Sequence, residues 1–266
     1  MRRPEPVEGA PAPDSTAVVT GAAGGIGRAL AARLVAEGVR VVVNDIDDVR
    51  LTETAKEIGA HPVAGDAASE EGVKHLVDAA TDHLGQIDAW YGNAGIDRGI
   101  GLDCPEEDWQ ASHEVNVMAH VRAARLLVPG WVERGAGRYV VTASAAGLLT
   151  MVGTPTYSVT KHAAVAFAEW LSVTYRHRGV VVQAICPQGV RTGMLERSGQ
   201  MAGLLSRDGA LTPDQVADAA WEATADDRFL VLPHPEVGDY YAARATQTDK
   251  WLGGMNRLWQ HVEGQV

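Results

Sequence analysis

An apolar run that ends in a cluster of glycines constrains the fold of this chain more than any other feature. The run AVVT at 17–20 is followed by GAAGGIG at 21–27, and Leu30 and Leu34 then continue at helical spacing. A short apolar run without polar alternation is typical of a strand buried on both faces of a parallel sheet. The sequence therefore predicts a strand, a tight glycine turn and a helix in direct succession.

Strands and helices alternate in this way along most of the chain. We expect strands at 17–20, 39–43, 61–65, 87–91, 139–142, 180–185 and 229–232, and helices at 25–37, 48–58, 70–84, 105–134, 156–178, after a cap at Thr212, and at 236–260. Such alternation favours a parallel sheet that right-handed crossovers cover on both faces. The predicted fold class is α/β, a single doubly wound, Rossmann-type domain over 14–266 that follows a disordered tail at 1–13.

Charge and cysteine content exclude several classes of function. A formal net charge of −11 argues against a nucleic-acid-binding surface, which needs clustered Lys and Arg. No apolar run reaches the ~18 residues of a membrane span, and the first residues lack the apolar core of a signal peptide. Cys104 and Cys186 lie far apart, and the histidines show no metal spacing. We therefore expect no disulfide, no metal site and a cytoplasmic location.

The glycine turn and a downstream acidic residue together predict a dinucleotide site. Glycines let the backbone approach a pyrophosphate, whose charge faces the N-terminus of the helix. Asp45, at the end of the second strand, can accept hydrogen bonds from both hydroxyls of an adenosine ribose and would repel a 2′-phosphate. Ile46, Asp47 and Asp48 follow, and Gly24 adds no cation. With no Arg or Lys at these positions to hold a 2′-phosphate, we expect NAD rather than NADP.

Tyr157 and Lys161 lie four residues apart and so share one face of a predicted helix. A free tyrosine has a pKa near ~10, which is too high for a base at neutral pH, and a neighbouring cation lowers it. Ser144 follows the fifth strand, at the carboxyl edge where ligands bind to a doubly wound sheet. Together the three residues predict an acid/base site.

In combination these motifs resemble the short-chain dehydrogenase/reductase family, in particular its compact branch. The resemblance extends from Thr16 to about His234 and includes TGxxxGxG at 20–27 and YxxxK at 157–161. It also includes GNAG at 92–95, where the family has NNAG. The implied activity is the NAD-dependent interconversion of a secondary alcohol and a ketone.

The resemblance also implies roles for single residues. Tyr157 would exchange a proton with the substrate, and Ser144 would hydrogen-bond the substrate oxygen. Lys161 would lower the tyrosine pKa and bind the nicotinamide ribose, while Asn116 would hold a water that relays protons to solvent. The residues expected to bind NAD are Gly21, Gly25, Ile26, Gly27, Asp45, Ile46, Asp66, Ala67, Asn93, Ala94, Gly95, Tyr157, Lys161, Pro187, Val190 and Thr192.

Two positions depart from the family pattern. Gly92 replaces the first Asn of NNAG and removes a side chain that normally steadies the sheet, although we expect little loss of catalysis. Gln188 stands where the family has the glycine of Pro-Gly, and Gly189 follows one residue later. Gln188 is therefore expected on the nicotinamide or substrate side of the site.

Three segments, 96–103, 145–153 and 188–211, are expected to line the substrate pocket, with a lid at about 193–211. Their apolar residues are Ile100, Leu102, Leu148, Leu149, Met151, Val152, Met194, Leu195, Met201, Leu204 and Leu205. This composition favours an aryl, alicyclic or steroid-like alcohol. The alternative is that these side chains only pack the lid against the domain. An anionic substrate stays an alternative, because Arg98 and Arg191 could bind a negatively charged group.

Two other functions are weighed against this interpretation. NADPH-dependent ketoreduction is opposed by Asp45, and a catalytically silent NAD sensor should lack at least one of Ser144, Tyr157 and Lys161. The resemblance implies a homodimer or homotetramer built on the helix at 105–134 and the helix that carries Tyr157. The aromatic tail from Val237 either packs on a neighbouring subunit or covers its own core.

Overall fold

A computed structural model describes residues 15–197, 203 and 209–263. The predicted tail at 1–13 lies outside these residues, as do Met201, Leu204 and Leu205 of the expected lid. The described chain contains a parallel seven-stranded sheet in the order β3-β2-β1-β4-β5-β6-β7. The strands are β1 (Thr16–Thr20), β2 (Arg40–Asp45), β3 (His61–Ala64), β4 (Ala89–Gly92), β5 (Gly137–Thr142), β6 (Val180–Ile185) and β7 (Leu230–Val231).

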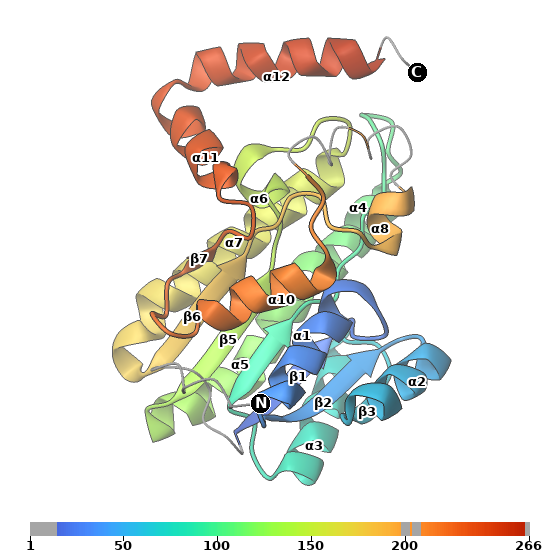
Figure 1. Cartoon of the computed structure of the whole chain (residues 1–266), viewed down its shortest axis with the longest axis vertical. Helices are drawn as coiled ribbons and strands as arrows, with labels where there is room; N and C mark the ends of the chain where they lie inside the picture. The colour runs from blue at the N-terminus through green and yellow to red at the C-terminus, as the bar shows by residue number, and fades with distance from the viewer. Residues whose placement is uncertain (1–14, 198–202, 204–208, 264–266) are drawn as a thin grey trace, which may run out of the picture.

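Helices connect these strands and cover the sheet (Figure 1). They are α1 (Gly25–Ala36), α2 (Asp48–Ile58), α3 (Glu70–Leu84), α4 (Glu106–His113), the π-helix η1 (Glu114–Met118), α5 (Ala119–Arg134), α6 (Ala146–Leu149), α7 (Pro155–Tyr175), the 3₁₀-helix η2 (Arg176–Arg178), α8 (Gly193–Arg197), α10 (Pro213–Glu222), α11 (Glu236–Thr246) and α12 (Thr248–Glu263). The predicted doubly wound, Rossmann-type α/β fold is confirmed.

Successive residues of each strand face opposite layers of helices. In β1, Val18 belongs to the core that includes α3, α5 and α7, whereas Ala17 and Val19 belong to the core that includes α1, α2 and α10. Figure 1 shows α1 and α10 in front of the sheet and α5 behind it. Burial on both faces explains why the strands show no polar alternation.

The strand order reverses between β1 and β4. From β1 the chain continues to β2 and β3 on one side, and β4 to β7 continue on the other. In such sheets the crevice outside the carboxyl ends of the two central strands is the place where ligands bind. The fold therefore brings the ends of β1 and β4, at Thr20 and Gly92, together at the expected site.

The long helix predicted at 105–134 is three helices in succession. The π-helix η1 separates α4 from α5 and contains Asn116, which is fully buried. One extra residue in a turn shifts the side chains that follow it around the helix axis. The hydrophobic pattern along 105–134 gave no sign of this insertion.

The final helix predicted at 236–260 is also divided. Gln247, with φ −137° and ψ 52°, ends α11, and α12 then leads away from the sheet. In Figure 1 α12 lies across the top of the molecule, apart from the sheet layers. None of the described helices is long and apolar enough to cross a membrane.

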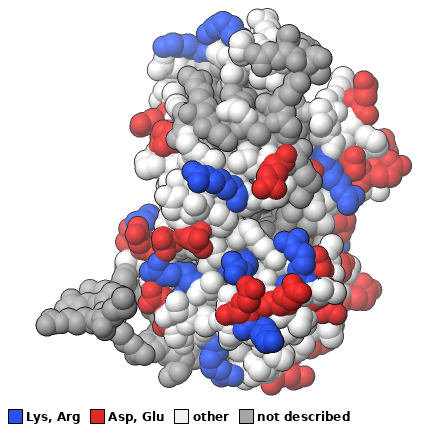
Figure 2. Space-filling model, turned by 45° about the vertical axis from the view of Figure 1, so that its right-hand side comes forward, with Lys and Arg blue, Asp and Glu red and all other residues white. Residues whose placement is uncertain are grey.

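The surface carries both signs of charge. On the face drawn in Figure 2, Asp and Glu side chains separate the Lys and Arg side chains, and this face shows no continuous basic area. Cys104 and Cys186 are both free and buried. Within the described ranges, no cluster of three or more His, Cys, Asp or Glu residues could hold a metal ion.

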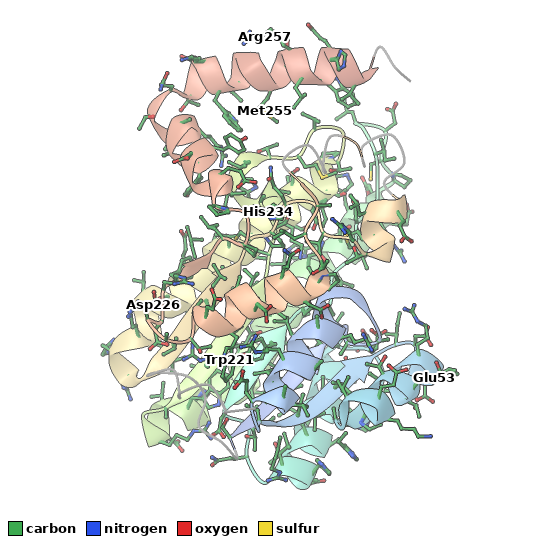
Figure 3. The ribbon with its side chains drawn as sticks, in the orientation of Figure 1. Glu53, Trp221, Asp226, His234, Met255 and Arg257 are labelled. Atoms are coloured by element: carbon green, nitrogen blue, oxygen red, sulfur yellow. The ribbon has the colours of Figure 1, made fainter. Side chains whose placement is uncertain are left out.

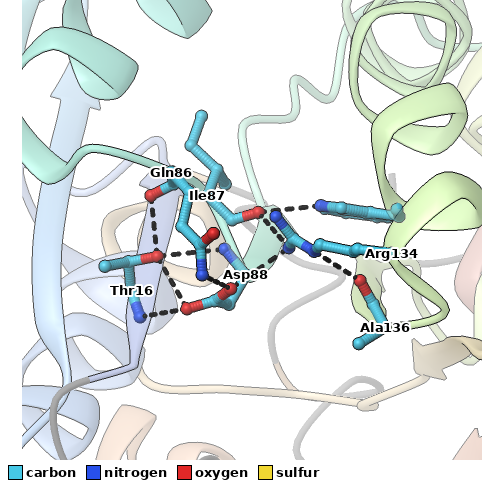
Figure 4. A network of polar contacts seen from close by, with 7 residues as sticks. Thr16, Gln86, Ile87, Asp88, Arg134 and Ala136 are labelled. Atoms are coloured by element: carbon cyan, nitrogen blue, oxygen red, sulfur yellow. Dashed lines mark hydrogen bonds and ion pairs between the residues drawn. The ribbon is translucent and has the colours of Figure 1, made fainter.

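A polar network joins the amino ends of β1 and β4 to the end of α5 (Figure 4). Asp88 Oδ2 accepts hydrogen bonds from the backbone N and from Oγ1 of Thr16, both at 3.0 Å. Its Oδ1 accepts from Arg134 Nη2 at 3.1 Å, and the same nitrogen donates to the Ile87 carbonyl at 2.7 Å. Asp88 therefore satisfies a backbone donor and a guanidinium at once.

We predict that Asp88→Ala lowers the free energy of unfolding by about 2–3 kcal/mol, because it leaves the Thr16 N–H without its acceptor and removes the charged partner of Arg134. Urea unfolding of both proteins measures the difference. Asp78→Ala is the control, since Asp78 forms an exposed pair with Lys74 on α3 and should cost less than about 0.5 kcal/mol. Equal losses in the two variants would contradict a structural role for the network.

Candidate active site

A cavity of about 1000 Å³ lies at the carboxyl edge of the sheet. The expected site residues that line it are Gly21, Gly25, Ile26, Asp45, Ile46, Asp66, Ala67, Asn93, Ala94, Gly95, Ser144, Tyr157, Lys161, Pro187, Val190 and Thr192. Gly27 and Asn116 are buried behind this lining. The structure thus brings together residues that are spread along most of the chain.

The glycine turn forms a cradle that side chains would fill. A Cβ on Gly27 would lie 2.2 Å from the Gly21 carbonyl oxygen, and Gly21 and Gly25 have φ values of 64° and 55°. A Cβ on Gly25 would also lie 3.3 Å from the Thr192 methyl group. The open backbone at the N-terminus of α1 fits a pyrophosphate, which needs close approach and exposed N–H groups.

Hydrogen bonds fix the glycine turn to the segment after β4. Thr20 Oγ1 accepts from the backbone N of Asn93 and of Ala94, both at 3.0 Å. Asn93 Nδ2 donates to the carbonyls of Thr20 at 3.0 Å and Gly21 at 3.1 Å. Thr20 and Asn93 therefore fix the position of the glycine turn relative to the segment after β4.

Two carboxylates stand on the nucleotide side of the cavity. Asp45 accepts hydrogen bonds from the backbone N of Ala23 at 3.0 Å and of Asp47 at 3.1 Å. Asp66 accepts from the backbone N of Ala68 at 2.8 Å and of Ser69 at 3.0 Å. Partial burial raises the pKa of Asp66, but hydrogen bonds from Ser69 and Ala68 outweigh it, so the net shift is downward. Both carboxylates line the cavity.

Arg50 was missed by the sequence analysis, which found no cation beside Asp45. A Cβ added to Gly24 would lie 2.9 Å from Nη2 of Arg50 on the first turn of α2. The guanidinium therefore lies against the glycine turn. The sequence predicted a helix that begins at Asp48. Because this helix leads the chain back from the end of β2, its first turn, with Arg50, could have been expected near the glycine turn.

Tyr157 and Ser144 meet at the cavity. Pro155 starts α7, and Tyr157 follows within the first turn, so the helix start directs the phenol to the sheet edge. Burial raises the pKa of Tyr157 to about 12, while a hydrogen bond from Ser144 acts in the opposite direction. Ser144 Oγ also accepts from the backbone N of Ala146 at 3.1 Å, which orients the hydroxyl.

Lys161 lies one helical turn beyond Tyr157 and is only 3% exposed. Its Nζ donates to the Thr142 carbonyl at 2.8 Å and lies 5.7 Å from the centroid of the Tyr157 ring. Burial lowers the pKa of Lys161 to about 8. A Cβ on Gly95 would lie 3.2 Å from Nζ, so the glycine keeps room beside the ammonium.

Asn116 braces the site from behind. Its Oδ1 accepts from the backbone N of Ile96 at 2.9 Å, and its Nδ2 donates to the Ile96 carbonyl at 2.9 Å and to Thr160 Oγ1 at 3.0 Å. These bonds connect η1, the segment after β4 and α7. The proton-relay role expected for Asn116 stays a prediction.

His120 fills the space that Gly92 leaves. A Cβ on Gly92 would lie 2.6 Å from Nδ1 of His120, which is 2% exposed. The hydroxyl of Tyr139 donates to the His120 carbonyl at 3.1 Å. Burial, and to a lesser extent the charge of Lys161, lower the pKa of His120 to about 3. A neutral imidazole thus occupies the site of the side chain that the sequence analysis found missing.

Gln188 lines the cavity, as expected, and its backbone is held by a residue that the sequence analysis did not single out. Gln188 N donates to Nδ1 of His234 at 3.1 Å, and Nε2 of His234 lies 3.2 Å from the Gly209 carbonyl oxygen. His234 is 3% exposed and stands below α11 in Figure 3. It connects the segment after β6 to Gly209.

The apolar lining agrees only in part with expectation. Leu149, Met151, Val152, Met194 and Leu195 line the cavity. Ile100 and Leu102 do not, being 80% and 96% exposed, and Leu148 is buried in the core. Arg98 lines the cavity, whereas Arg191 Nε donates to the Ala210 carbonyl at 3.1 Å.

The C-terminal helices supply a second wall of the cavity that was not predicted, with apolar side chains beside Gln247, Lys250 and Arg257. Tyr240 on α11 and Trp251, Met255 and Leu258 on α12 line the cavity. Figure 3 shows Met255 on the side of α12 towards the body of the molecule, and Arg257 of the same helix is also among the residues that line the cavity. The spacing of 251, 255 and 258 is that of one helix face, which could have indicated this wall.

Comparison with known proteins gives consistent matches. A family model described as short chain dehydrogenase matches residues 15–203. The chain is 34% identical over 262 residues to 1-deoxy-11-beta-hydroxypentalenate dehydrogenase of Streptomyces avermitilis, with 93% of this chain and 91% of that protein covered. It is 32% identical to human epidermal retinol dehydrogenase 2, with 81% of this chain and 73% of that protein covered. A crystal structure of a short chain dehydrogenase/reductase from Burkholderia phymatum in complex with NAD has a TM-score of 0.81 and 29% identity, with 88% of this chain and 94% of that chain covered.

The buried ammonium of Lys161 gives a pH-dependent prediction. Below about pH 8 both the folded and the unfolded chain are protonated at Lys161, and the full cost of burying the charge is present. Between a pKa of about 8 in the folded chain and 10.5 in the unfolded chain, only the unfolded chain keeps the proton, so stability rises with pH. This residue should contribute a rise on the order of 2–3 kcal/mol over that window.

Lys161→Met should remove that rise, and urea unfolding at about pH 7 and about pH 10 measures it. Lys56→Met, at an exposed position on α2, is the control and should leave the pH dependence unchanged. A Lys161→Met protein that gains as much stability with pH as the parent would contradict the prediction.

Proposed function

The chain belongs to the short-chain dehydrogenase/reductase family, and from that membership we propose that it is an NAD-dependent alcohol dehydrogenase with Tyr157 as its acid/base. The general reaction is the interconversion of a secondary alcohol and a ketone, in keeping with the dehydrogenases to which the chain is similar. The observation that carries the proposal is the Tyr157 phenol, which lines the same cavity as Ser144 and the glycine cradle and lies one helical turn from Lys161.

In the oxidative direction Tyr157 takes the proton of the substrate hydroxyl, and in the reductive direction it returns that proton to the ketone oxygen. Ser144 donates a hydrogen bond to the same oxygen and stabilises the charge that develops on it. When bound, NAD would supply the hydride acceptor for this reaction. Burial raises the pKa of the Tyr157 phenol, so groups that favour the phenolate, such as a hydrogen bond from Ser144, are needed for it to act as a base.

Lys161 positions the cofactor and favours the phenolate. Its bond to the Thr142 carbonyl uses one N–H, which leaves two for ribose hydroxyls on the cavity side. The space beside Gly95 is the place for that ribose. An ammonium at this distance from Tyr157 also lowers the cost of ionising the phenol.

Asp45 supports NAD over NADP. Its carboxylate lies on the cavity wall, where it accepts from the glycine turn and can accept from ribose hydroxyls. A 2′-phosphate would bring two negative charges close to it. NADPH-dependent ketoreduction is therefore the second candidate, which the cofactor measurements below distinguish.

The lining supports an apolar, bulky substrate. Leu149, Met151 and Val152 form one wall, and Trp251 and Met255 on α12 form the other. Two relatives are named as a dehydrogenase of a hydroxypentalenate and as a retinol dehydrogenase. We propose an alicyclic or aryl secondary alcohol as the substrate of this chain.

Exposed apolar side chains support assembly into a homodimer or homotetramer. Leu126 on α5 is 45% exposed, and Val159, Trp170 and Val173 on α7 are 55%, 55% and 84% exposed. These are the two helices on which the family resemblance places a subunit interface. The oligomeric state and a cytoplasmic location stay predictions.

Tyr157→Phe should reduce kcat by about a hundred- to ten-thousandfold with a panel of alicyclic and aryl secondary alcohols, because no group is left to accept the proton. NADH formation at 340 nm measures turnover, and tryptophan quenching should give an NADH Kd within about threefold of the parent. Near-normal turnover with intact NADH binding would contradict the mechanism. A parent protein that binds NADH and oxidises none of the alcohols would favour a silent NAD sensor.

Met255→Ala should raise KM for bulky alicyclic alcohols about three- to tenfold, because it removes methylene and thioether surface from the cavity wall. The kcat/KM for a small alcohol such as 2-propanol should change by less than about twofold. Leu252→Ala is the control, because Leu252 is 58% exposed on the same helix. Equal effects of the two substitutions would argue against α12 as a substrate wall.

A further inference from the structure

Arg50 is a cation at the nucleotide site that no motif of the sequence accounts for. Its Nη2 would be 2.9 Å from a Cβ on Gly24, so the guanidinium covers the residue that precedes the second glycine of the motif. A residue with a basic side chain at position 24 would direct its charge to this same space. Arg50 supplies that charge from α2 instead.

The position of Arg50 is set by the helix start. Asp47 caps α2, and its Oδ1 accepts from the backbone N of Arg50 at 3.1 Å. Within the ranges that the structure describes, the Arg50 guanidinium forms no ion pair or hydrogen bond, even though Asp48 and Glu53 lie on the same helix (Glu53 is labelled in Figure 3). The cation is therefore available to a ligand.

Arg50 and Asp45 flank the same turn. Asp45 Oδ2 accepts from Ala23 N at 3.0 Å, and Gly24, which Arg50 covers, is the next residue. The carboxylate is suited to the 2′- and 3′-hydroxyls of an adenosine ribose, whereas a guanidinium is suited to a phosphate. Opposite charges thus flank the glycine turn at Ala23 and Gly24.

We propose that Arg50 is a latent 2′-phosphate contact, so that Asp45 alone determines the preference for NAD. The inference rests on the proposed nucleotide site. With the carboxylate present, its repulsion of the 2′-phosphate offsets the attraction of Arg50. With the carboxylate neutralised, the guanidinium is left facing the 2′-position and binds NADP without any added basic residue.

The test compares four proteins: the parent, Asp45→Asn, Arg50→Gln and the double variant. Asn at 45 keeps an acceptor for Ala23 N while removing the charge, and Gln at 50 keeps most of the length of the side chain. Dissociation constants for NADPH and NADH are measured by tryptophan quenching, and thermal melts check that each variant is folded. Lys56→Gln in the Asp45→Asn background is the matched control, since it removes one positive charge from the same helix.

Asp45→Asn should bind NADPH about tenfold or more tightly than the parent, and Arg50→Gln in that background should return the Kd to within about threefold of the parent value. The Lys56→Gln control should keep the gain, and added salt should reduce it. Arg50→Gln alone should change the NADH Kd by less than about threefold.

Two results would overturn the proposal: no gain in NADPH affinity in Asp45→Asn, or a gain that persists in the double variant. Failure of the proposed enzyme function is separate from both. A parent protein that binds NADH but turns over no alcohol or ketone would contradict that function, while the Arg50 measurement still stands because it depends on binding alone.

Discussion

The candidate site depends on the hydrogen bonds that Thr20 and Asn93 exchange across the reversal of strand order. The crossovers from β1 and β4 lead in opposite directions, so the connections themselves do not hold the two strand ends together. Thr20 Oγ1 accepts from two backbone N–H groups after β4, and Asn93 Nδ2 returns two bonds to the glycine turn. The shape of the cradle follows from this closed set of bonds.

The sequence predicted those elements whose ends are fixed by local chemistry. The bounds of α2 and α3 agree with expectation, because Asp47 and Ser69 cap their starts and Gly59 and Gly85 end them. The capping box predicted at Thr212 is present in α10. The π-helix η1 and the break between α11 and α12 were missed, because an extra residue or one changed backbone torsion leaves the hydrophobic pattern almost unaltered.

Site residues within a motif were easier to predict than those brought in from elsewhere in the fold. Ser144, Tyr157 and Lys161 follow strand or helix ends that the pattern indicated, and they line one cavity. Arg50 and Met255 approach the site through the directions of α2 and α12, which depend on how these helices pack. These directions depend on contacts between residues that are far apart in the sequence. Local sequence patterns therefore could not predict that Arg50 and Met255 lie at the site.

The pairing of Gly92 with His120 has a consequence for how this chain can vary. Since a Cβ at 92 would lie 2.6 Å from the imidazole, an asparagine there requires a smaller residue at 120. A smaller residue at 120 with glycine retained would leave a void and remove the imidazole that packs edge to face against the Tyr139 ring. Positions 92 and 120 should therefore covary among related sequences. A larger residue at 92 is expected together with a smaller residue at 120.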